Sequence, residues 1–413
     1  MPQTEHKSNM DTCRHVFIIG AKSIGQYGGY ESFLDNLIRQ HEDEAGLCYH
    51  IVTKANGEGC MDETKLDTVI QEDGMFLYHG ARVVKLHVPQ VGPAQAVLYD
   101  IKAMRYCLNA IREKRIDGAA VYVLACRIGP FFGRLVRQAH KLGCTVYINP
   151  DGHEWMRAKW SKPVRAYWRW SEALMVKHAD CVVCDSVRIE QYIKSTYEKH
   201  APNTDYIAYG ADVELSMLSD EDASFTGWLE RHGLAPHVYY MCCGRFVPEN
   251  SFEVMIRAFM QSNTTKCFAL ITTKNEAFLK ELDKKLHFSA DPRIRFTGPV
   301  YDAQLLRKIR ENAYANFHGH TVGGTNPSLL EALASTDVNL LVDVGFNREV
   351  AQDAALYWKN DAHDLAVLIE HVDTMTETER LALGEKAKER IRTAYNWKKI
   401  ADQYLNLWKK SDK

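Results

Sequence analysis

The sequence lacks the features that mark membrane-spanning, secreted and nucleic-acid-binding chains. Its 413 residues contain no apolar run that approaches the roughly 20 residues of a membrane helix. The polar start, MPQTEHKSNMDTC, contains acids and does not read as a signal peptide. The formal net charge of −2 gives no reason to expect a nucleic-acid partner. These absences predict a soluble cytoplasmic protein.

Cysteine is present, but not in a metal-binding or disulfide pattern. The 11 cysteines are an odd number and lie mostly within apolar runs such as VYVLACR and CVVCDS. Cys181 and Cys184 have the CxxC spacing, but neither a second CxxC nor a histidine pair accompanies them. We therefore expect reduced thiols in the core rather than a zinc or redox site.

Length and patterning predict two α/β domains, because 413 residues exceed one ordinary core. Short runs rich in β-branched and aromatic residues alternate with helical stretches, and the alternation restarts near residue 238. The first expected strands are HVFIIG (15–20), CYHIVTK, ARVVKLHV, VYVLAC (121–126), CTVYIN (144–149), DCVVCDS and DYIAYG. The second series is VYYMCCG (238–244), CFALIT, RIRFTG, YANFHG and NLLVDV. In the first half, the helices between them are expected over 29–41, 97–115, 130–142, 163–178 and 186–197.

Nearly continuous apolar strands with helices between them indicate parallel sheets covered on both faces. The acidic stretch Tyr209–Asp222 is the best linker candidate, so we expect domains over 1–210 and 211–395. The last segment, 396–413, is expected to be helical and to pack back on the first domain. Ligands of such sheets bind outside the carboxyl ends of the strands, which predicts an active-site cleft between two facing domains.

The loop after YANFHG has the features of an anion site. In HGHTVGGTNPSLLEAL, Asn326 is a good N-cap and is followed by proline at the first helical position. Free amides and the positive end of the helix dipole favour an anion, and Gly323 and Gly324, before Thr325, let it approach the backbone. The alternative is a tight turn before an ordinary capped helix.

Two more loops follow expected strands. Gly28 and Gly29 lie just before the helix that follows HVFIIG, and Arg245 follows VYYMCCG. Arg245 would complement an anion such as a diphosphate as a charge-assisted donor, the alternative being a solvated surface arginine. A D-x-D occurs at Asp220–Asp222, but it lies in the linker and not after a strand. We expect no metal there.

Four stretches, GQYGGYESF, GRFVPENSFEVMIRAF, RIRFTGPVYDAQLLRKI and NPSLLEALAS, resemble the GT-B glycosyltransferases of family 4. The resemblance extends over nearly the whole chain, to the closing YNWKKIADQYLNLW. Within that family, ACRIGPFFG, NPDGHEWMRAKWSKPVRAYW and GGTNPSLLEALASTDVNLLVDVGFNREVA resemble the bacterial β-1,4-rhamnosyltransferases of wall and capsular polysaccharide assembly. The resemblance implies the GT-B fold, with two facing doubly wound Rossmann-like domains.

The resemblance also implies roles for single residues. It assigns Gly28 and Gly29 to the donor diphosphate or sugar, Arg245 to the diphosphate, and Glu331 to the nucleotide ribose as the second carboxylate of the E-x7-E signature. The first carboxylate of that signature is here Gly323, and the lysine usual after GR-x-x-P-E is here Asn250. A 6-deoxy donor sugar has fewer hydroxyls, so a differently built sugar pocket is physically reasonable.

The stretch NPDGHEWMRAKWSKPVRAYWRW (149–170) begins where an expected strand ends. We rank Asp151 first as the carboxylate that activates the acceptor or orients the sugar, and Glu154 second. His153 is expected to be a neighbour rather than a catalyst. The alternative for Asp151 is a turn former before glycine.

The implied reaction is a retaining transfer of L-rhamnose from dTDP-β-L-rhamnose to a lipid-linked acceptor, GlcNAc-diphosphate-undecaprenol, with a β-1,4 linkage. By resemblance, the leaving diphosphate accepts the acceptor's proton on the same face while the sugar passes through an oxocarbenium-like state. Arg245 and the helix amides would neutralise the leaving group, so we expect no metal and no cofactor. The rival functions are a family 4 transferase with a UDP-sugar donor, an inactive nucleotide-sugar-binding GT-B protein, and a GT-B epimerase.

The same stretch predicts peripheral contact with the inner face of the cell membrane. Five basic residues and no acid lie between Trp155 and Trp170, with further aromatic residues interleaved. The basic residues are Arg157, Lys159, Lys162, Arg165 and Arg169, and the aromatic ones are Trp160, Tyr167 and Trp168. This composition suits an anionic lipid surface. The alternatives are a solvated helix with inward-packed aromatics and a site for the acceptor's own diphosphate.

Overall fold

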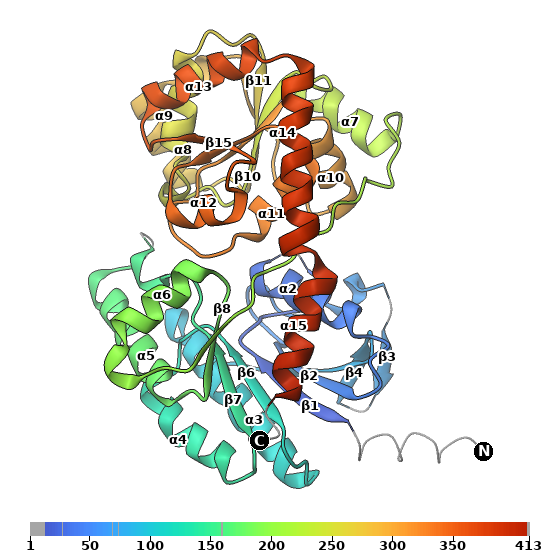
Figure 1. Cartoon of the computed structure of the whole chain (residues 1–413), viewed down its shortest axis with the longest axis vertical. Helices are drawn as coiled ribbons and strands as arrows, with labels where there is room; N and C mark the ends of the chain where they lie inside the picture. The colour runs from blue at the N-terminus through green and yellow to red at the C-terminus, as the bar shows by residue number, and fades with distance from the viewer. Residues whose placement is uncertain (1–12, 27, 68, 73, 158–159, 411–413) are drawn as a thin grey trace, which may run out of the picture. The chain divides into compact units, whose positions relative to one another are not determined.

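The computed structural model describes residues 13–26, 28–67, 69–72, 74–157 and 160–410. The chain forms two compact units (Figure 1). The N-terminal unit comprises the described parts of Met1–Met156, Trp160–Ala208 and Trp397–Lys413. The C-terminal unit comprises those of Arg157–Lys159 and Tyr209–Asn396.

The N-terminal unit is built on one sheet, which has nine strands among the described residues, in the order β3-β4-β5-β2-β1-β6-β7-β8-β9. Its strands are β1 (Arg14–Ile19), β2 (Leu47–Lys54), β3 (Ile70–Glu72), β4 (Met75–Tyr78), β5 (Ala81–Leu86), β6 (Ala120–Leu124), β7 (Thr145–Asn149), β8 (Cys181–Cys184) and β9 (Thr204–Tyr206). From β5 to β9 all neighbours are parallel, while β3 and β4 add an antiparallel edge. The parallel part runs outward from β1 and β6, the arrangement of a doubly wound fold.

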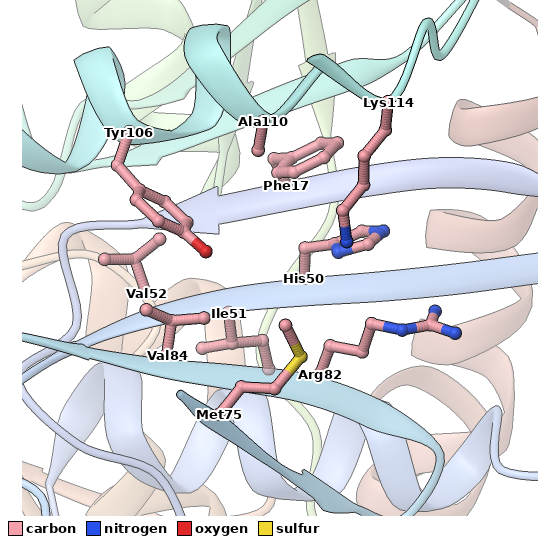
Figure 2. Close-up of a pocket in the computed structure, with 10 residues that line it drawn as sticks. All are labelled: Phe17, His50, Ile51, Val52, Met75, Arg82, Val84, Tyr106, Ala110 and Lys114. Atoms are coloured by element: carbon pink, nitrogen blue, oxygen red, sulfur yellow. The ribbon is translucent and has the colours of Figure 1, made fainter. Parts of the chain in front are cut away.

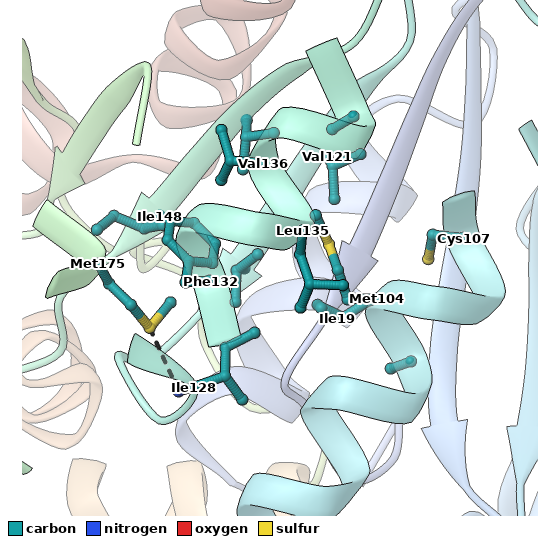
Figure 3. Close-up of a cluster of buried hydrophobic side chains, with 14 of the residues drawn as sticks. Ile19, Met104, Cys107, Val121, Ile128, Phe132, Leu135, Val136, Ile148 and Met175 are labelled. Carbon is teal, nitrogen blue, oxygen red and sulfur yellow. Dashed lines mark hydrogen bonds between the residues drawn. The ribbon is translucent and has the colours of Figure 1, made fainter. Parts of the chain in front are cut away.

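Helices connect these strands. They are α2 (Gly29–Gln40), α3 (Gln95–Glu113), α4 (Gly129–His140), α5 (Lys162–His178), α6 (Val187–Thr196) and α15 (Trp397–Lys409). The expected helical ranges of the first half agree with α2 to α6 within two residues at each end. Apolar side chains of α3 and α4 pack on one face of the sheet, where Figure 3 shows Met104 and Phe132 in one cluster with Ile19, Val121 and Ile148. The alternate residue Tyr122 contacts α15 instead, so the sheet is covered on both faces, which explains the nearly continuous apolar strands.

The last helix, α15, belongs to the N-terminal unit although it ends the chain. Its aromatic residues are buried: Tyr404 and Trp408 contact Tyr122 of β6, and Trp408 also contacts Tyr147 of β7. The hydroxyls of Tyr122 and Tyr404 lie 3.2 Å apart. The periodic aromatics of the closing segment are therefore the buried face of a helix that packs on this sheet.

The C-terminal unit has a fully parallel sheet, with six strands in the described residues in the order β12-β11-β10-β13-β14-β15. They are β10 (Tyr239–Cys243), β11 (Cys267–Ile271), β12 (Ile294–Phe296), β13 (Ala315–His318), β14 (Asn339–Val342) and β15 (Leu356–Trp358). The helices are α7 (Ala223–His232), α8 (Phe252–Gln261), α9 (Glu276–Leu286), α10 (Ala303–Glu311), α11 (Pro327–Ser335), α12 (Gly345–Ala351), α13 (Ala362–Thr374) and α14 (Glu377–Arg390). This strand order is that of the Rossmann fold, and it reverses direction between β10 and β13.

The cysteines depart from the expectation in one place. Cys13 and Cys48, at the amino ends of β1 and β2, form a disulfide, so the prediction that all thiols are reduced is wrong for this pair. The sequence pattern could not reveal it, because 35 residues separate the two cysteines and only strand pairing brings them together. The other nine cysteines are free, and Cys181 and Cys184 are buried.

Among the described residues, no helix is both long and apolar enough to cross a bilayer.

Candidate functional site

In the C-terminal unit, two of the predicted loops lie side by side at the carboxyl edge of the sheet. Because β10 and β13 are parallel neighbours, the loop that begins at Gly244 and the loop that begins at Gly319 leave the sheet at the same edge. They flank the point where the strand order reverses, which is where ligands of doubly wound sheets bind.

The two loops are joined by close contacts. Thr321 donates hydrogen bonds to the carbonyl of Glu249 from its amide, at 3.1 Å, and from its hydroxyl, at 2.8 Å. A side chain on Gly319 would bring its Cβ within 2.4 Å of the Asn250 carbonyl oxygen, so only glycine fits there. The loops therefore form one surface with limited freedom.

Asn250, the residue at the position of the expected lysine, has a structural contact. Its side chain is 3 % exposed, and its Nδ2 donates a 2.8 Å hydrogen bond to the carbonyl of Arg245. This hydrogen bond from a buried amide helps to fix the backbone position from which the Arg245 side chain extends. Asn250 thus contacts the backbone of the residue that is predicted to bind the diphosphate.

His320 is a neighbour of Arg245 that the sequence does not single out. Its ring stacks on His318, with centroids 4.3 Å apart. Burial lowers the pKa of His320 to about 3, and the positive charge of Arg245 contributes to this effect. The imidazole is therefore neutral at physiological pH, and its buried Nδ1 has no hydrogen-bond partner among the described residues. A neutral ring nitrogen beside an arginine is available to a polar ligand group.

The amino end of α11 has the geometry expected of an anion site. The side chain of Asn326 caps the helix by accepting a 3.0 Å hydrogen bond from the amide of Ser328. Gly323 has φ 148°, a conformation that side chains rarely adopt, and Thr325 is 2 % exposed. A glutamate at 323, which the resemblance would place there as the first carboxylate, would be strained in this conformation.

Glu331 lies one turn into α11 and is fixed by an arginine from α10. Its Oε2 forms a 2.7 Å ion pair with Nη1 of Arg310, whose side chain is 4 % exposed. Ser328 shares this cluster, because its hydroxyl accepts a 3.4 Å hydrogen bond from Nη2 of Arg310 and donates to the carbonyl of Cys243 at 3.3 Å. With 34 % of its side chain exposed, Glu331 is held in place by one oxygen while part of the carboxylate faces solvent.

In the N-terminal unit, Gly28 and Gly29 precede and begin α2 as predicted. Gly29 is exposed, with room around it, whereas a Cβ at Gly28 would lie 2.4 Å from Oε2 of Glu31. The Glu31 carboxylate also accepts a 3.0 Å hydrogen bond from the amide of Lys22. The amino end of α2 therefore already has a carboxylate close by.

Asp151 follows β7 in a strained turn, with φ 59°. Its amide donates to Oδ1 of Asn149 at 2.8 Å, and its own Oδ1 accepts from the amide of Gly152 at 2.7 Å. Asp151 thus has the contacts of a turn former, and its charge also acts on a neighbour. Burial raises the pKa of Tyr30, and the negative charge of Asp151 contributes to this rise.

The other residues of this loop pack against aromatic rings. Glu154 accepts a 2.8 Å hydrogen bond from the indole nitrogen of Trp160. His153 lies against Tyr192, with ring centroids 4.2 Å apart, and burial lowers its pKa. Glu154 thus has a contact within this stretch, and His153 has one with α6.

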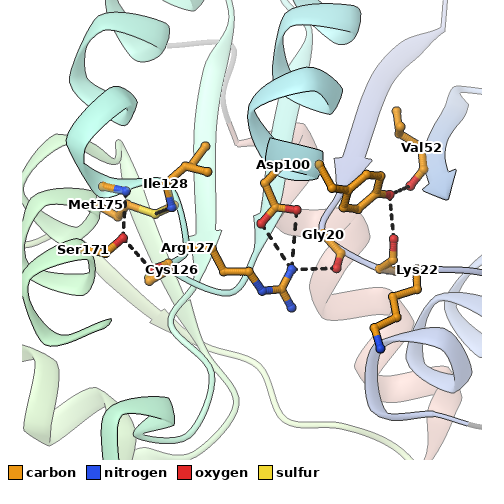
Figure 4. Close-up of polar contacts among 12 residues, drawn as sticks. Gly20, Lys22, Val52, Asp100, Cys126, Arg127, Ile128, Ser171 and Met175 are labelled. Carbon is orange, nitrogen blue, oxygen red and sulfur yellow. Dashed lines mark hydrogen bonds and ion pairs between the residues drawn. The ribbon is translucent and has the colours of Figure 1, made fainter. Parts of the chain in front are cut away.

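A buried ion pair that the sequence did not predict joins the carboxyl ends of β1 and β6 (Figure 4). Nη1 of Arg127 donates to the carbonyl of Gly20 at 2.9 Å and contacts Oδ2 of Asp100 at 3.2 Å. Asp100 is 0 % exposed, and burial raises its pKa to about 6, although Arg127 opposes this rise. The sequence did contain one indication of Arg127. It directly follows the strand run VYVLAC, just as Arg245 directly follows VYYMCCG.

A pocket and an acidic motif lie apart from these loops. The shallow pocket in Figure 2, between α3 and strands β1, β2 and β5, is lined by Arg82 and Lys114 among others and contains none of the predicted site residues. In the acidic D-x-D, Asp220 pairs with Lys308 at 2.6 Å and Asp222 caps α7. Both carboxylates thus have partners within the chain.

Comparison with known proteins adds a domain match and a fold. Residues 13–212 match the family model described as "Domain of unknown function (DUF1972)". No curated protein matches the chain. The structure resembles Anabaena HepE in complex with UDP, with a TM-score of 0.69 and 15% identity over 96% of this chain and 100% of that one.

Two further solved structures are similar over nearly their whole length. Sucrose-phosphate synthase from Thermosynechococcus elongatus gives a TM-score of 0.72 at 16% identity, covering 96% of this chain and 98% of that one. The trehalose 6-phosphate synthase of Burkholderia multivorans gives 0.71 at 12% identity, with 97% of each chain covered. With two Rossmann-like units and these structural relatives, the chain has the GT-B fold of glycosyltransferase structures.

Proposed function

We propose that the protein is a retaining glycosyltransferase that uses a nucleotide diphosphate-sugar donor. The observation that carries this proposal is the joined pair of loops in the C-terminal unit. There Arg245, the neutral imidazole of His320 and the capped amino end of α11 lie at the carboxyl edge where the strand order reverses. A guanidinium and free helix amides together suit a diphosphate.

Each group in these loops has a task in the proposed reaction. Arg245 and the α11 amides stabilise the negative charge that develops on the leaving diphosphate. Glu331, held by Arg310, accepts hydrogen bonds from the nucleotide ribose. The leaving diphosphate takes the proton of the acceptor hydroxyl on the face where the new bond forms, while the sugar passes through an oxocarbenium-like state. Neutralisation by the protein makes a metal unnecessary, so we expect activity to survive EDTA.

The donor we propose is dTDP-β-L-rhamnose. Its support is the resemblance to bacterial rhamnosyltransferases and the backbone conformation at Gly323, which disfavours the usual first carboxylate. A 6-deoxy sugar has fewer hydroxyls, so a sugar pocket without that carboxylate is physically reasonable. The UDP-sugar alternative has an observation in its favour, because HepE has been solved with UDP-glucose.

For the acceptor we propose a sugar on a lipid diphosphate, GlcNAc-diphosphate-undecaprenol, extended through a β-1,4 linkage. Asp151 would orient or activate the acceptor hydroxyl, with Glu154 in support. The lipid carrier requires contact with an anionic membrane. Lys162, Arg169 and Trp170 on α5 are exposed, the last at 54 %, and supply cations and an aromatic ring for that contact.

A panel of nucleotide sugars tests the proposal. We expect dTDP release from dTDP-β-L-rhamnose only when lipid-linked GlcNAc is present, with the product linkage read by nuclear magnetic resonance. Release of UDP from a UDP-sugar with the same acceptor would replace the donor assignment. Donor binding without release identifies an inactive binding protein, and conversion of the donor without acceptor identifies an epimerase.

A further inference from the structure

The amino ends of β1 and β2 carry a cluster of thiols and imidazoles that the proposed reaction does not use. Cys13 precedes β1, His15 is its second residue, and Cys48 is the second residue of β2. The parallel register places His15 opposite Cys48, and the Cα atoms of the two cysteines lie 6.0 Å apart. Gly28 and Asp151 follow the carboxyl ends of their strands, so this cluster lies at the other edge of the sheet.

We propose that Cys13, His15 and Cys48 form a binding site for a thiophilic divalent cation such as Zn²⁺ when the disulfide is reduced. One ligand atom from each residue lies within 4.8 Å of the other two. Sγ of Cys13 lies 3.7 Å from Nε2 of His15. In a tetrahedral zinc site, bond lengths of about 2.3 Å to sulfur and 2.0–2.1 Å to nitrogen separate such atoms by roughly 3.6 Å.

His50 contacts the proposed ligand His15 on its second ring nitrogen. Its Nε2 lies 2.8 Å from Nδ1 of His15, and both imidazoles are buried. When His15 donates from Nδ1, its Nε2 keeps the lone pair that a metal needs, on the side that faces Cys13. The ring of His50 is itself held by stacking on Phe17 at 4.2 Å. Metal-binding histidines are commonly oriented by such a partner on the second nitrogen.

Ligand type favours this cation, and the two thiolates compensate its charge. Arg82 and Lys114 line the pocket beside His50 (Figure 2), so the surroundings already carry positive charge. Two thiolates cancel the charge of a divalent ion, so its binding adds no net charge there. Thiolate with imidazole selects zinc over the hard cations, which prefer oxygen. Three protein ligands leave a fourth position for water.

Reduction and metal binding are separate, balanced steps. Two thiols of a cellular reductant give two electrons and two protons to the Cys13–Cys48 disulfide and become a disulfide themselves. The cation then displaces both thiol protons as it binds. Disulfide and metal site are thus alternative states of one pair, and the redox poise selects between them.

Cobalt titration of the full-length protein tests the site. After anaerobic reduction, we expect one equivalent of Co²⁺ to produce a thiolate-to-cobalt charge-transfer band, which Zn²⁺ removes. Cys48→Ser and His15→Gln should each weaken binding at least 100-fold, His50→Gln about 10- to 100-fold, and Cys60→Ser, a control at a partly buried free thiol, not at all. The oxidised protein should bind no cobalt.

Alkylation of the reduced parent gives a second measurement that does not depend on a variant folding. Zn²⁺ should protect Cys13 and Cys48 from iodoacetamide, as read by peptide mass spectrometry, while Cys60 reacts at the same rate with or without metal. The proposal is overturned if the reduced parent shows no charge-transfer band, if His15→Gln binds cobalt as the parent does, or if zinc does not protect the two cysteines.

Discussion

At the scale of single residues, the guanidinium of Arg245 is the cation on which the proposed donor site most depends. We predict that Arg245→Ala lowers kcat/KM for the nucleotide sugar by roughly 10²–10³-fold, about 2.7–4 kcal/mol, because a charge-assisted contact to the leaving diphosphate is lost. Arg245→Lys should recover part of this loss, since it keeps the charge without the planar fork.

The matched control for Arg245 is Arg231→Ala, which removes an exposed arginine from α7 of the same unit. Steady-state kinetics with the donor varied should leave this control unchanged. If Arg245→Ala had the kinetic constants of the parent, the diphosphate would have to bind elsewhere.

The buried Asp100 predicts a pH dependence of stability. Its pKa is about 6 in the folded protein and rises from 3.8, so the folded state holds a proton that the unfolded state releases. Between these values the unfolding free energy falls as pH rises, so the stability present below pH 4 is lost as pH passes 6. Asp100→Asn removes this dependence, which amounts to about 3 kcal/mol.

Urea unfolding at a series of pH values from 4 to 7 measures the effect. The difference in unfolding free energy, parent minus Asp100→Asn, should decrease as pH rises, while Asp43→Asn, an exposed site, gives a flat difference. A difference that stays constant or increases with pH would show that Arg127 keeps Asp100 ionised throughout.

Single residues were predictable where a local pattern reveals them. Asn326 and Arg245 are visible in the sequence because a cap precedes its helix and a strand-end arginine follows its strand. Asp100 and His320 are not, because their properties come from burial and from partners distant in the chain. The pairing of Cys13 with Cys48 was missed for the same reason.

At the scale of secondary-structure elements, the nine residues of α11 would serve the proposed donor site in two ways. Its amino end presents amides, and one turn further Glu331 is fixed by Arg310 at 2.7 Å. We predict that Glu331→Gln weakens dTDP binding roughly 5- to 10-fold, about 1 kcal/mol, because a carboxylate is a stronger acceptor for ribose hydroxyls than an amide.

Calorimetric titration with dTDP measures this change. Glu377→Gln, at an exposed position of α14, is the control and should bind as the parent does. Because the substitution also weakens the pair with Arg310, thermal unfolding of each variant separates a loss of stability from a loss of affinity. Unchanged dTDP affinity in Glu331→Gln would remove the ribose assignment.

The sequence identified the fully buried strands and missed short strands that are exposed or only partly buried. β10 and β13 are fully buried and were expected as strands. The strands β3 and β4 were not expected, since β3 is exposed along its whole length and β4 has only four residues. β15, which has three residues, was not expected either. Short edge strands depend on pairing with a neighbour, which a hydrophobic pattern does not record.

At the scale of the whole molecule, the fold is similar to that of proteins with very different sequences. The solved structures named above share 12% to 16% of their residues with this chain, yet their TM-scores are 0.69 to 0.72. The fold is therefore retained when most side chains change. Under the proposed function, the choice between rhamnose and another sugar would depend on positions such as Gly323.

The net charge of the whole molecule does not reveal the local basic surface on α5. The formal net charge is −2, but the one acid of α5, Glu172, is buried and accepts hydrogen bonds from Tyr192 and Tyr197. Of the predicted basic-aromatic stretch, Lys159 lies outside the described residues, and Trp168 is buried. Lys162, Arg169 and Trp170 remain on the surface.

We predict that the protein sediments with vesicles containing anionic phospholipid and detaches as salt rises. Each basic residue near such a surface contributes roughly 1 kcal/mol, and the attraction falls off within about 10 Å at 0.1 M salt. The double variant Lys162→Glu/Arg169→Glu should lose sedimentation, and Trp170→Ala should weaken it, because apolar insertion is lost.

The control variant Lys177→Glu/Lys199→Glu makes the same charge change at exposed positions of the same unit and should sediment as the parent does. Equal sedimentation of both double variants would move the membrane contact to another face. A loss of activity on a short-chain, water-soluble acceptor in Lys162→Glu/Arg169→Glu would instead assign these cations to the acceptor's own diphosphate.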